Sequence, residues 1–164
     1  TIARIIVLAV IGWVLLLGYW HFFPSQETQI RRMFGELARV VSISPNSSPL
    51  ANLAAANELA SFFTKDVEIN LDVPGVGRHT FNGREEIIQA AVAARSNSRS
   101  VKVEFLDLNV KLDAGKESAT VDLTAKVTQT GERDFGVQEL KFQLKRVDGE
   151  WRITRMDTVH TLGL

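Results

Sequence analysis

The sequence predicts an α+β protein: a single N-terminal transmembrane helix, then a domain in which three helices pack on a curved antiparallel sheet. Three observations support this fold class. The chain opens with a long apolar run, hydrophobic residues then recur at helical spacing, and most segments after Lys65 alternate with a period of two. Pro24 marks the boundary, so we expect an anchor over residues 1–23 and a folded domain over residues 24–164.

Composition narrows the classes of function. The 164 residues include 19 Lys+Arg and 19 Asp+Glu, so the formal net charge is zero. A neutral chain has no overall electrostatic attraction to nucleic acid. The absence of cysteine excludes disulfides, thiolate zinc sites, cysteine-ligated iron–sulfur clusters and a cysteine nucleophile. We therefore expect no nucleic-acid partner. We also expect no cofactor and no metal, since neither His79 nor His160 has a carboxylate or a second histidine at a metal-ligand spacing.

The leading stretch has the length and composition of a membrane span. Residues 5–20 carry no charge. As a helix, the wider run of roughly 22 positions reaches about 33 Å, enough for a hydrocarbon core of about 30 Å. No small-residue cleavage site follows it, which favours an uncleaved anchor over a secretory signal. The stretch ends in an aromatic belt predicted to lie at the membrane interface: Tyr19, Trp20, His21, Phe22 and Phe23.

Membrane orientation follows from the few residues before the span, which are typical of a signal anchor with its amino terminus in the cytoplasm. This predicts the inner membrane of a bacterium as the location, with the folded domain in the periplasm. Membrane lipids are then the first expected partners.

Three helices are predicted in the folded domain. Ser25 can cap a helix over residues 26–42, and Ser48 can cap a second helix that starts at Pro49. Asn82, with Glu85 three places on, resembles a capping box for a third helix over residues 83–95.

The remaining segments predict strands. Residues 67–73 alternate in hydrophobicity and return through a turn to a short strand over residues 78–81. In 101–112 the apolar phase shifts from odd to even positions, which predicts a β-bulge near Phe105 and Leu106 and hence a curved sheet. Two more alternating strands follow, and a tight turn then leads to a last strand over residues 151–161.

Two motifs resemble one known family. The segment Phe81-Asn82-Gly83-Arg84-Glu85-Glu86-Ile87 is similar to the F-x-G-R-x-E-I turn of SnoaL-like proteins, and Val147-Asp148-Gly149-Glu150-Trp151-Arg152-Ile153 is similar to their last hairpin. With the order of elements, they make the chain resemble the nuclear transport factor 2-like superfamily. The resemblance implies a cone with an interior pocket and a possible homodimer through the sheet, in a family of enzymes, ligand binders and assembly modules.

Catalytic candidates are few. Enzymes that the chain resembles hold an Asp or His base inside the cone, often with a tyrosine, but the only tyrosine here is Tyr19 in the predicted span. Simple alternation places Trp151, Arg155 and Asp157 on one strand face. If that face lines the cone, Asp157 is either a base steadied by Arg155 or, as we favour, half of a structural ion pair. His79 is a further candidate.

The inward rows are otherwise apolar, so we expect a filled interior, with Trp151, Phe105, Phe142 and Phe62 blocking the cone. The leading hypothesis is a non-enzymatic, membrane-anchored accessory or assembly subunit, a scaffold within a bacterial respiratory, photosynthetic, transport or secretion complex. The alternative is a membrane-surface small-molecule binder, or an enzyme of the isomerase, dehydratase or cyclase kind. A cavity of a few hundred Å³ would favour the alternative.

Overall fold

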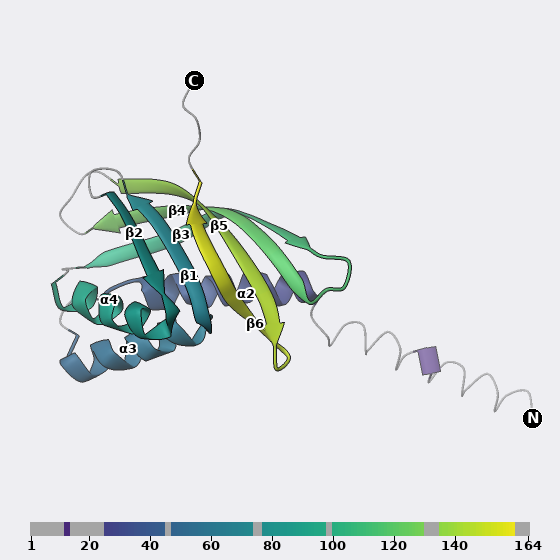
Figure 1. Ribbon diagram of the computed structural model, residues 1–164, viewed down its shortest axis with the longest axis horizontal. Helices are drawn as coiled ribbons and strands as arrows, with labels where there is room; N and C mark the ends of the chain where they lie inside the picture. The colour runs from purple at the N-terminus through teal and green to yellow at the C-terminus, as the bar shows by residue number, and fades with distance from the viewer. Residues whose placement is uncertain are drawn as a thin grey trace, which may run out of the picture.

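A computed structural model describes residues 12–13, 25–44, 47–73, 77–97, 100–129 and 135–159 (Figure 1). The predicted anchor over 1–23, with its interface residues Tyr19, Trp20, His21, Phe22 and Phe23, lies outside this description except for Gly12 and Trp13. Among the residues that are described, no helix combines the length and the apolar character needed to cross a membrane.

The described chain has the predicted α+β architecture, with three helices against one curved sheet (Figure 1). The elements in chain order are α2 (Gln26–Val41), α3 (Pro49–Ser61), β1 (Phe63–Val73), β2 (Gly77–Asn82), α4 (Gly83–Asn97), β3 (Val101–Leu112), β4 (Ser118–Gln129), β5 (Phe135–Val147) and β6 (Glu150–Thr158).

The six strands of the sheet run in the order β2-β1-β6-β5-β4-β3. All neighbouring pairs are antiparallel except β1 and β6, which are parallel. The prediction of a wholly antiparallel sheet is therefore wrong at this one pair. The parallel pair brings the first strand of the domain beside the last, and it begins at Phe63, four residues before the predicted strand.

The helix starts follow the predicted caps. The Ser25 hydroxyl accepts a hydrogen bond from the Thr28 amide at 3.2 Å, and Ser48 does the same for Ala51 at 3.2 Å. The predicted partner at the start of α4 is wrong by one residue, because the carboxylate of Glu86, not Glu85, accepts from the Asn82 amide at 2.7 Å.

The F-x-G-R motif has a structural role at the junction of β2 and α4. Gly83 has a φ of +79°, and a Cβ there would lie 3.2 Å from the carbonyl oxygen of Lys65. A side chain at this position would be both strained and crowded. The next residue, Arg84, donates from Nε to the Phe63 carbonyl at 2.7 Å. Together these residues fix the start of α4 against the first strand.

The core lies between α2 and the concave face of the sheet. Phe34 packs edge-to-face on Phe142, with ring centroids 4.9 Å apart, and on Phe105, at 5.9 Å. At the start of α2, the indole N–H of Trp151 donates to Oε1 of Gln26 at 3.1 Å. Aromatic packing and this hydrogen bond hold α2 along the sheet.

A β-bulge bends β3 as predicted, but slightly further along the strand. The register with β4 shifts between Leu106 and Asn109, and Asp107 takes a φ of +53°. Leu106 therefore pairs with Thr124 on the outer face, where it is 44% exposed, although the hydrophobic pattern predicted that it points inward.

Candidate functional site

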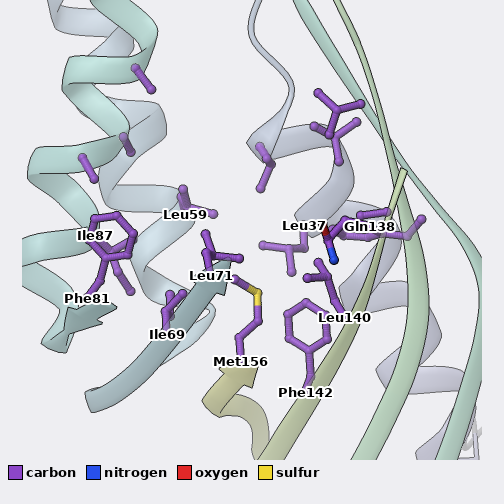
Figure 2. Close-up of a pocket in the computed structure, with 18 of the residues that line it drawn as sticks. Leu37, Leu59, Ile69, Leu71, Phe81, Ile87, Gln138, Leu140, Phe142 and Met156 are labelled. Carbon is purple, nitrogen blue, oxygen red and sulfur yellow. The ribbon is translucent and has the colours of Figure 1, made fainter. Parts of the chain in front are cut away.

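A pocket of about 780 Å³ opens between the concave face of the sheet and the three helices (Figure 2). The expectation of a filled interior is wrong, since Phe105 and Phe142 form part of the wall and do not block the cone. The described residues that line the pocket come from every element. They are Leu37, Val41, Leu59, Phe63, Ile69, Leu71, Phe81, Ile87, Ala90, Ala91, Ala94, Val103, Phe105, Ala125, Val127, Gln129, Gly136, Val137, Gln138, Leu140, Phe142 and Met156.

Small side chains leave the space open. The pocket side of α4 presents Ala90, Ala91 and Ala94, and β5 contributes Gly136 opposite Val127. A Cβ built on Gly136 meets no atom within 4 Å. Two of the rings predicted to block the interior, Phe105 and Phe142, pack against Phe34 and form part of the pocket wall. The other two are not in the described lining: Phe62 and Trp151, whose indole contacts Gln26 at the start of α2.

The described wall is almost entirely hydrocarbon. Its only polar side chains are those of Gln129 and Gln138, and none of its described residues is ionisable. A wall of this kind stabilises apolar ligands by removing their surface from water and disfavours charged ones. Within the described lining there is also no group that could serve as a general acid or base at neutral pH.

Arg155 and Asp157 lie on the opposite side of the sheet from the pocket. The register of β5 and β6 shifts where Thr154 is inserted, so that Ile153 pairs with Leu144 and Arg155 with Gln143. This bulge reverses the alternation along β6. Met156, which follows Arg155 in the chain, therefore lines the pocket. The residues that simple alternation predicted to point inward do so only as far as Ile153.

On the outer face, these two residues form a polar cluster with the neighbouring strand. Arg155 donates from Nε to Asp157 at 2.7 Å and from Nη1 to Glu68 at 2.9 Å. Asn70 donates to Asp157 at 3.0 Å and to Glu68 at 2.9 Å. The hydrogen bond from Arg155 is the main cause that lowers the pKa of Asp157, so this carboxylate is ionised at neutral pH and is a weak base.

His79 lies on the edge strand β2, opposite Leu71. Paired residues of antiparallel strands share a face, which puts His79 on the concave side, but it is exposed and is not part of the pocket wall. Across the described ranges, no three His, Cys, Asp or Glu residues gather where they could hold a metal ion.

The two glutamines of the wall were missed by the analysis of the sequence, although a signal for Gln138 was present. Leu140, Phe142 and Leu144 set the inward phase of β5, and extending this alternation backward places Gln138 and Gly136 on the same face. Neither side chain is an acid or a base, so a prediction based on ionisable residues does not include them.

Comparison with known proteins reveals one family. A model described as "SnoaL-like domain" matches residues 47–157, about two thirds of the chain. A comparison with curated proteins gives no match.

Several solved structures share the fold at low identity. A protein of unknown function from Mycobacterium tuberculosis is 20% identical with a TM-score of 0.64, over 82% of this chain and 75% of that chain. A protein from Novosphingobium aromaticivorans, provisionally assigned as a scytalone dehydratase, is 18% identical with a TM-score of 0.58, over 83% and 84%. Another from that organism, provisionally assigned as an aromatic ring hydroxylase, is 16% identical with a TM-score of 0.63, over 86% and 94%. At these identities the likeness concerns the fold alone.

Proposed function

Since the chain belongs to the SnoaL-like domain family, we propose that its pocket is a binding site for an apolar small molecule. One observation carries this proposal: a pocket of about 780 Å³ with a wall of aliphatic and aromatic side chains. Ligand pockets commonly enclose roughly 300–1,000 Å³. The alternative of a small-molecule binder is therefore favoured over a filled scaffold.

Binding is favoured over catalysis by the chemistry of the described wall. Isomerases and dehydratases need a group that moves a proton, and such a group must reach the bound substrate. The three candidates Asp157, Arg155 and His79 are not in the wall, and Arg155 and Asp157 lie across the sheet from it. Two solved structures that share the fold are provisionally assigned as enzymes, so the absence of turnover is itself part of the proposal.

A membrane location is the second part of the proposal. The uncharged stretch over residues 5–20 supports an anchor in the inner membrane of a bacterium, with the domain in the periplasm. Apolar ligands concentrate in lipid, so an anchored binder would sit near its supply. Three further expectations stay predictions: that the protein is an accessory subunit, that it has other subunits as partners, and that it forms a homodimer. Isolation in mild detergent with identification of co-purifying proteins would test them.

The binding proposal is tested with the full chain in lipid nanodiscs and fluorene, a neutral hydrocarbon probe. Equilibrium dialysis against empty discs gives the bound amount. We expect Gly136→Leu to weaken binding at least about tenfold, because the new side chain enters the pocket space. Gly35→Leu is the matched control: Gly35 is on the exposed side of α2, where an added Cβ also meets no atom within 4 Å.

Equal fluorene binding by Gly136→Leu and Gly35→Leu would contradict the proposal, since the probe would then be held by lipid or by the surface. Circular dichroism of both variants checks that the fold is intact. Saturating fluorene should also raise the free energy of unfolding of the natural chain, by about 2.7 kcal/mol at a concentration of one hundred times Kd.

A further inference from the structure

Gln138 places an amide within an otherwise apolar section of the pocket. Its neighbours on the concave face are Ala125 across the strand pair and Leu140 along β5. Figure 2 shows the side chain extending from its strand toward Leu37, with the nitrogen and oxygen at the end that faces the pocket. The other polar residue of the wall, Gln129, lies at the last position of β4, two inward positions beyond Ala125.

The amide of Gln138 has unused hydrogen-bonding capacity. Within the described ranges, no hydrogen bond joins its side chain to another residue. A primary amide can donate from Nε2 and accept at Oε1, so it can pair with a carbonyl or a hydroxyl group. A ligand that displaces water from this amide without replacing its hydrogen bonds loses affinity.

The described surroundings of Gln138 contain no charge to balance a charged ligand. No Lys, Arg, His, Asp or Glu belongs to the described wall, and Arg155 and Asp157 face away across the sheet. Moving an unpaired carboxylate or ammonium group into such a wall is unfavourable. The polar group that meets Gln138 is therefore expected to be neutral.

We propose that the pocket selects neutral, largely hydrocarbon molecules that carry one carbonyl or hydroxyl group directed at the Gln138 amide. Gln138 is thus the residue that determines specificity, and the apolar wall supplies most of the affinity. This inference rests on the proposed binding function, and it adds the class of ligand and the residue that reads it.

The test compares three probes built on one tricyclic hydrocarbon skeleton: fluorene, 9-fluorenone and fluorene-9-carboxylate. Dialysis is carried out with the full chain in nanodiscs, and binding is corrected for empty discs. We expect 9-fluorenone to bind about three- to tenfold more tightly than fluorene, as one neutral hydrogen bond allows. The carboxylate should bind at least about tenfold more weakly than fluorene.

Substitution assigns the preference to one side chain. Gln138→Leu should bring the ratio of 9-fluorenone to fluorene affinity to about one by removing the amide, with fluorene binding retained. Gln138→Met is a second variant that removes the amide but keeps an unbranched side chain of similar length. It serves as the test if leucine disturbs the packing of the pocket wall. Gln143→Leu is the matched control, since Gln143 is exposed on the outer face of the same strand and should keep the natural ratio.

The outcomes distinguish a failure of the binding function from a failure of the role of Gln138. If no probe binds in the pocket, the binding function itself is wrong. If fluorene binds but 9-fluorenone shows no preference, or the preference survives both substitutions of Gln138, the function stands and the role of Gln138 is overturned. Tight binding of the carboxylate would overturn the neutral character of the ligand.

Discussion

Asp157 shows how a single residue can carry charge in this fold without entering the pocket. It accepts hydrogen bonds from Arg155 at 2.7 Å and from Asn70 at 3.0 Å, and it is 30% exposed on the outer face. A carboxylate held in this way is ionised, and neighbouring side chains supply its hydrogen bonds. Its role is to join β6 to β1, which favours the structural ion pair over the catalytic base.

We predict that Asp157→Asn lowers the free energy of unfolding by about 1 kcal/mol at pH 7, as expected for a partly exposed charged hydrogen bond. Because Arg155 holds the pKa of Asp157 below its ordinary value of 3.8, the carboxylate stabilises the fold fully above that value. The contribution is lost as the pH falls through the lowered pKa. Urea denaturation of both proteins at pH 7 and at lower pH measures the difference.

Fluorene binding supplies the control for this variant. It should be unchanged in Asp157→Asn, because the substituted side chain lies across the sheet from the pocket. A folded Asp157→Asn variant that loses binding would contradict the placement of Asp157 on the outer face. A stability difference that grows toward acid pH would contradict the stabilising role of its charge.

At the scale of elements, one inserted residue in β6 decides which side chains line the pocket. Up to Ile153 the strand follows the simple alternation that the sequence predicted. Thr154 then occupies the bulge, so the positions after it reverse face and Met156 enters the pocket wall. The register of β6 therefore does not match the catalytic alternative, which required Arg155 and Asp157 to face the cone.

We predict that deletion of Thr154 lowers the free energy of unfolding by at most about 2 kcal/mol, because the shortened strand can pair with β5 in a regular register. After the deletion Ile153 is followed directly by Arg155, so simple alternation keeps Ile153 and Met156 on the pocket side and Asp157 on the outer face. Urea denaturation followed by circular dichroism measures the loss.

Thr154→Ala is the matched variant for the deletion, since it keeps the extra residue. It removes only the hydrogen bond from the Thr154 hydroxyl to the Gln143 carbonyl at 3.1 Å, and should cost at most about 1 kcal/mol. If the deletion costs more than about 3 kcal/mol beyond the cost of Thr154→Ala, Thr154 is not simply an inserted residue in β6.

At the scale of the whole molecule, the pocket lies near the C-terminal end of α2. The residues that precede the domain are joined to the N-terminal end of that helix. The helix begins at Gln26 beside Trp151, whereas the pocket wall uses only its later residues Leu37 and Val41. Fifteen helical steps from Gln26 to Val41 span about 22 Å. Leu37, the nearer of the two wall residues, is eleven steps or about 16 Å from Gln26, so the leading stretch joins the domain at the end of α2 that is away from the pocket.

We predict that the full chain stays with the membrane after an alkaline carbonate wash. A double substitution, Ile11→Arg with Leu15→Arg, should release it, because each arginine at the centre of a span costs about 2.5–3.5 kcal/mol. Ala51→Arg with Ala54→Arg adds the same charge at exposed positions of α3 and should leave the chain in the membrane. Release of the natural chain by carbonate would contradict the anchor.

The sequence by itself determined the α+β architecture of the described domain, two of the helix caps and the family, because these depend on local signals. Ser25 and Ser48 cap their own helices, Gly83 is required by its own backbone angle, and the motif around it led to a family resemblance that the SnoaL-like match confirms. A period of two also placed Leu140 and Phe142 correctly in the interior.

Only the tertiary structure decided the site. The bulge at Thr154 depends on how β6 pairs with β5. The open interior depends on the packing of Phe105 and Phe142 against Phe34, at the side of the cone. Neither is encoded within one segment, because register and cavity volume arise from several elements packed together. For that reason the charged candidates predicted for the pocket lie outside it, and an uncharged residue, Gln138, lies within it.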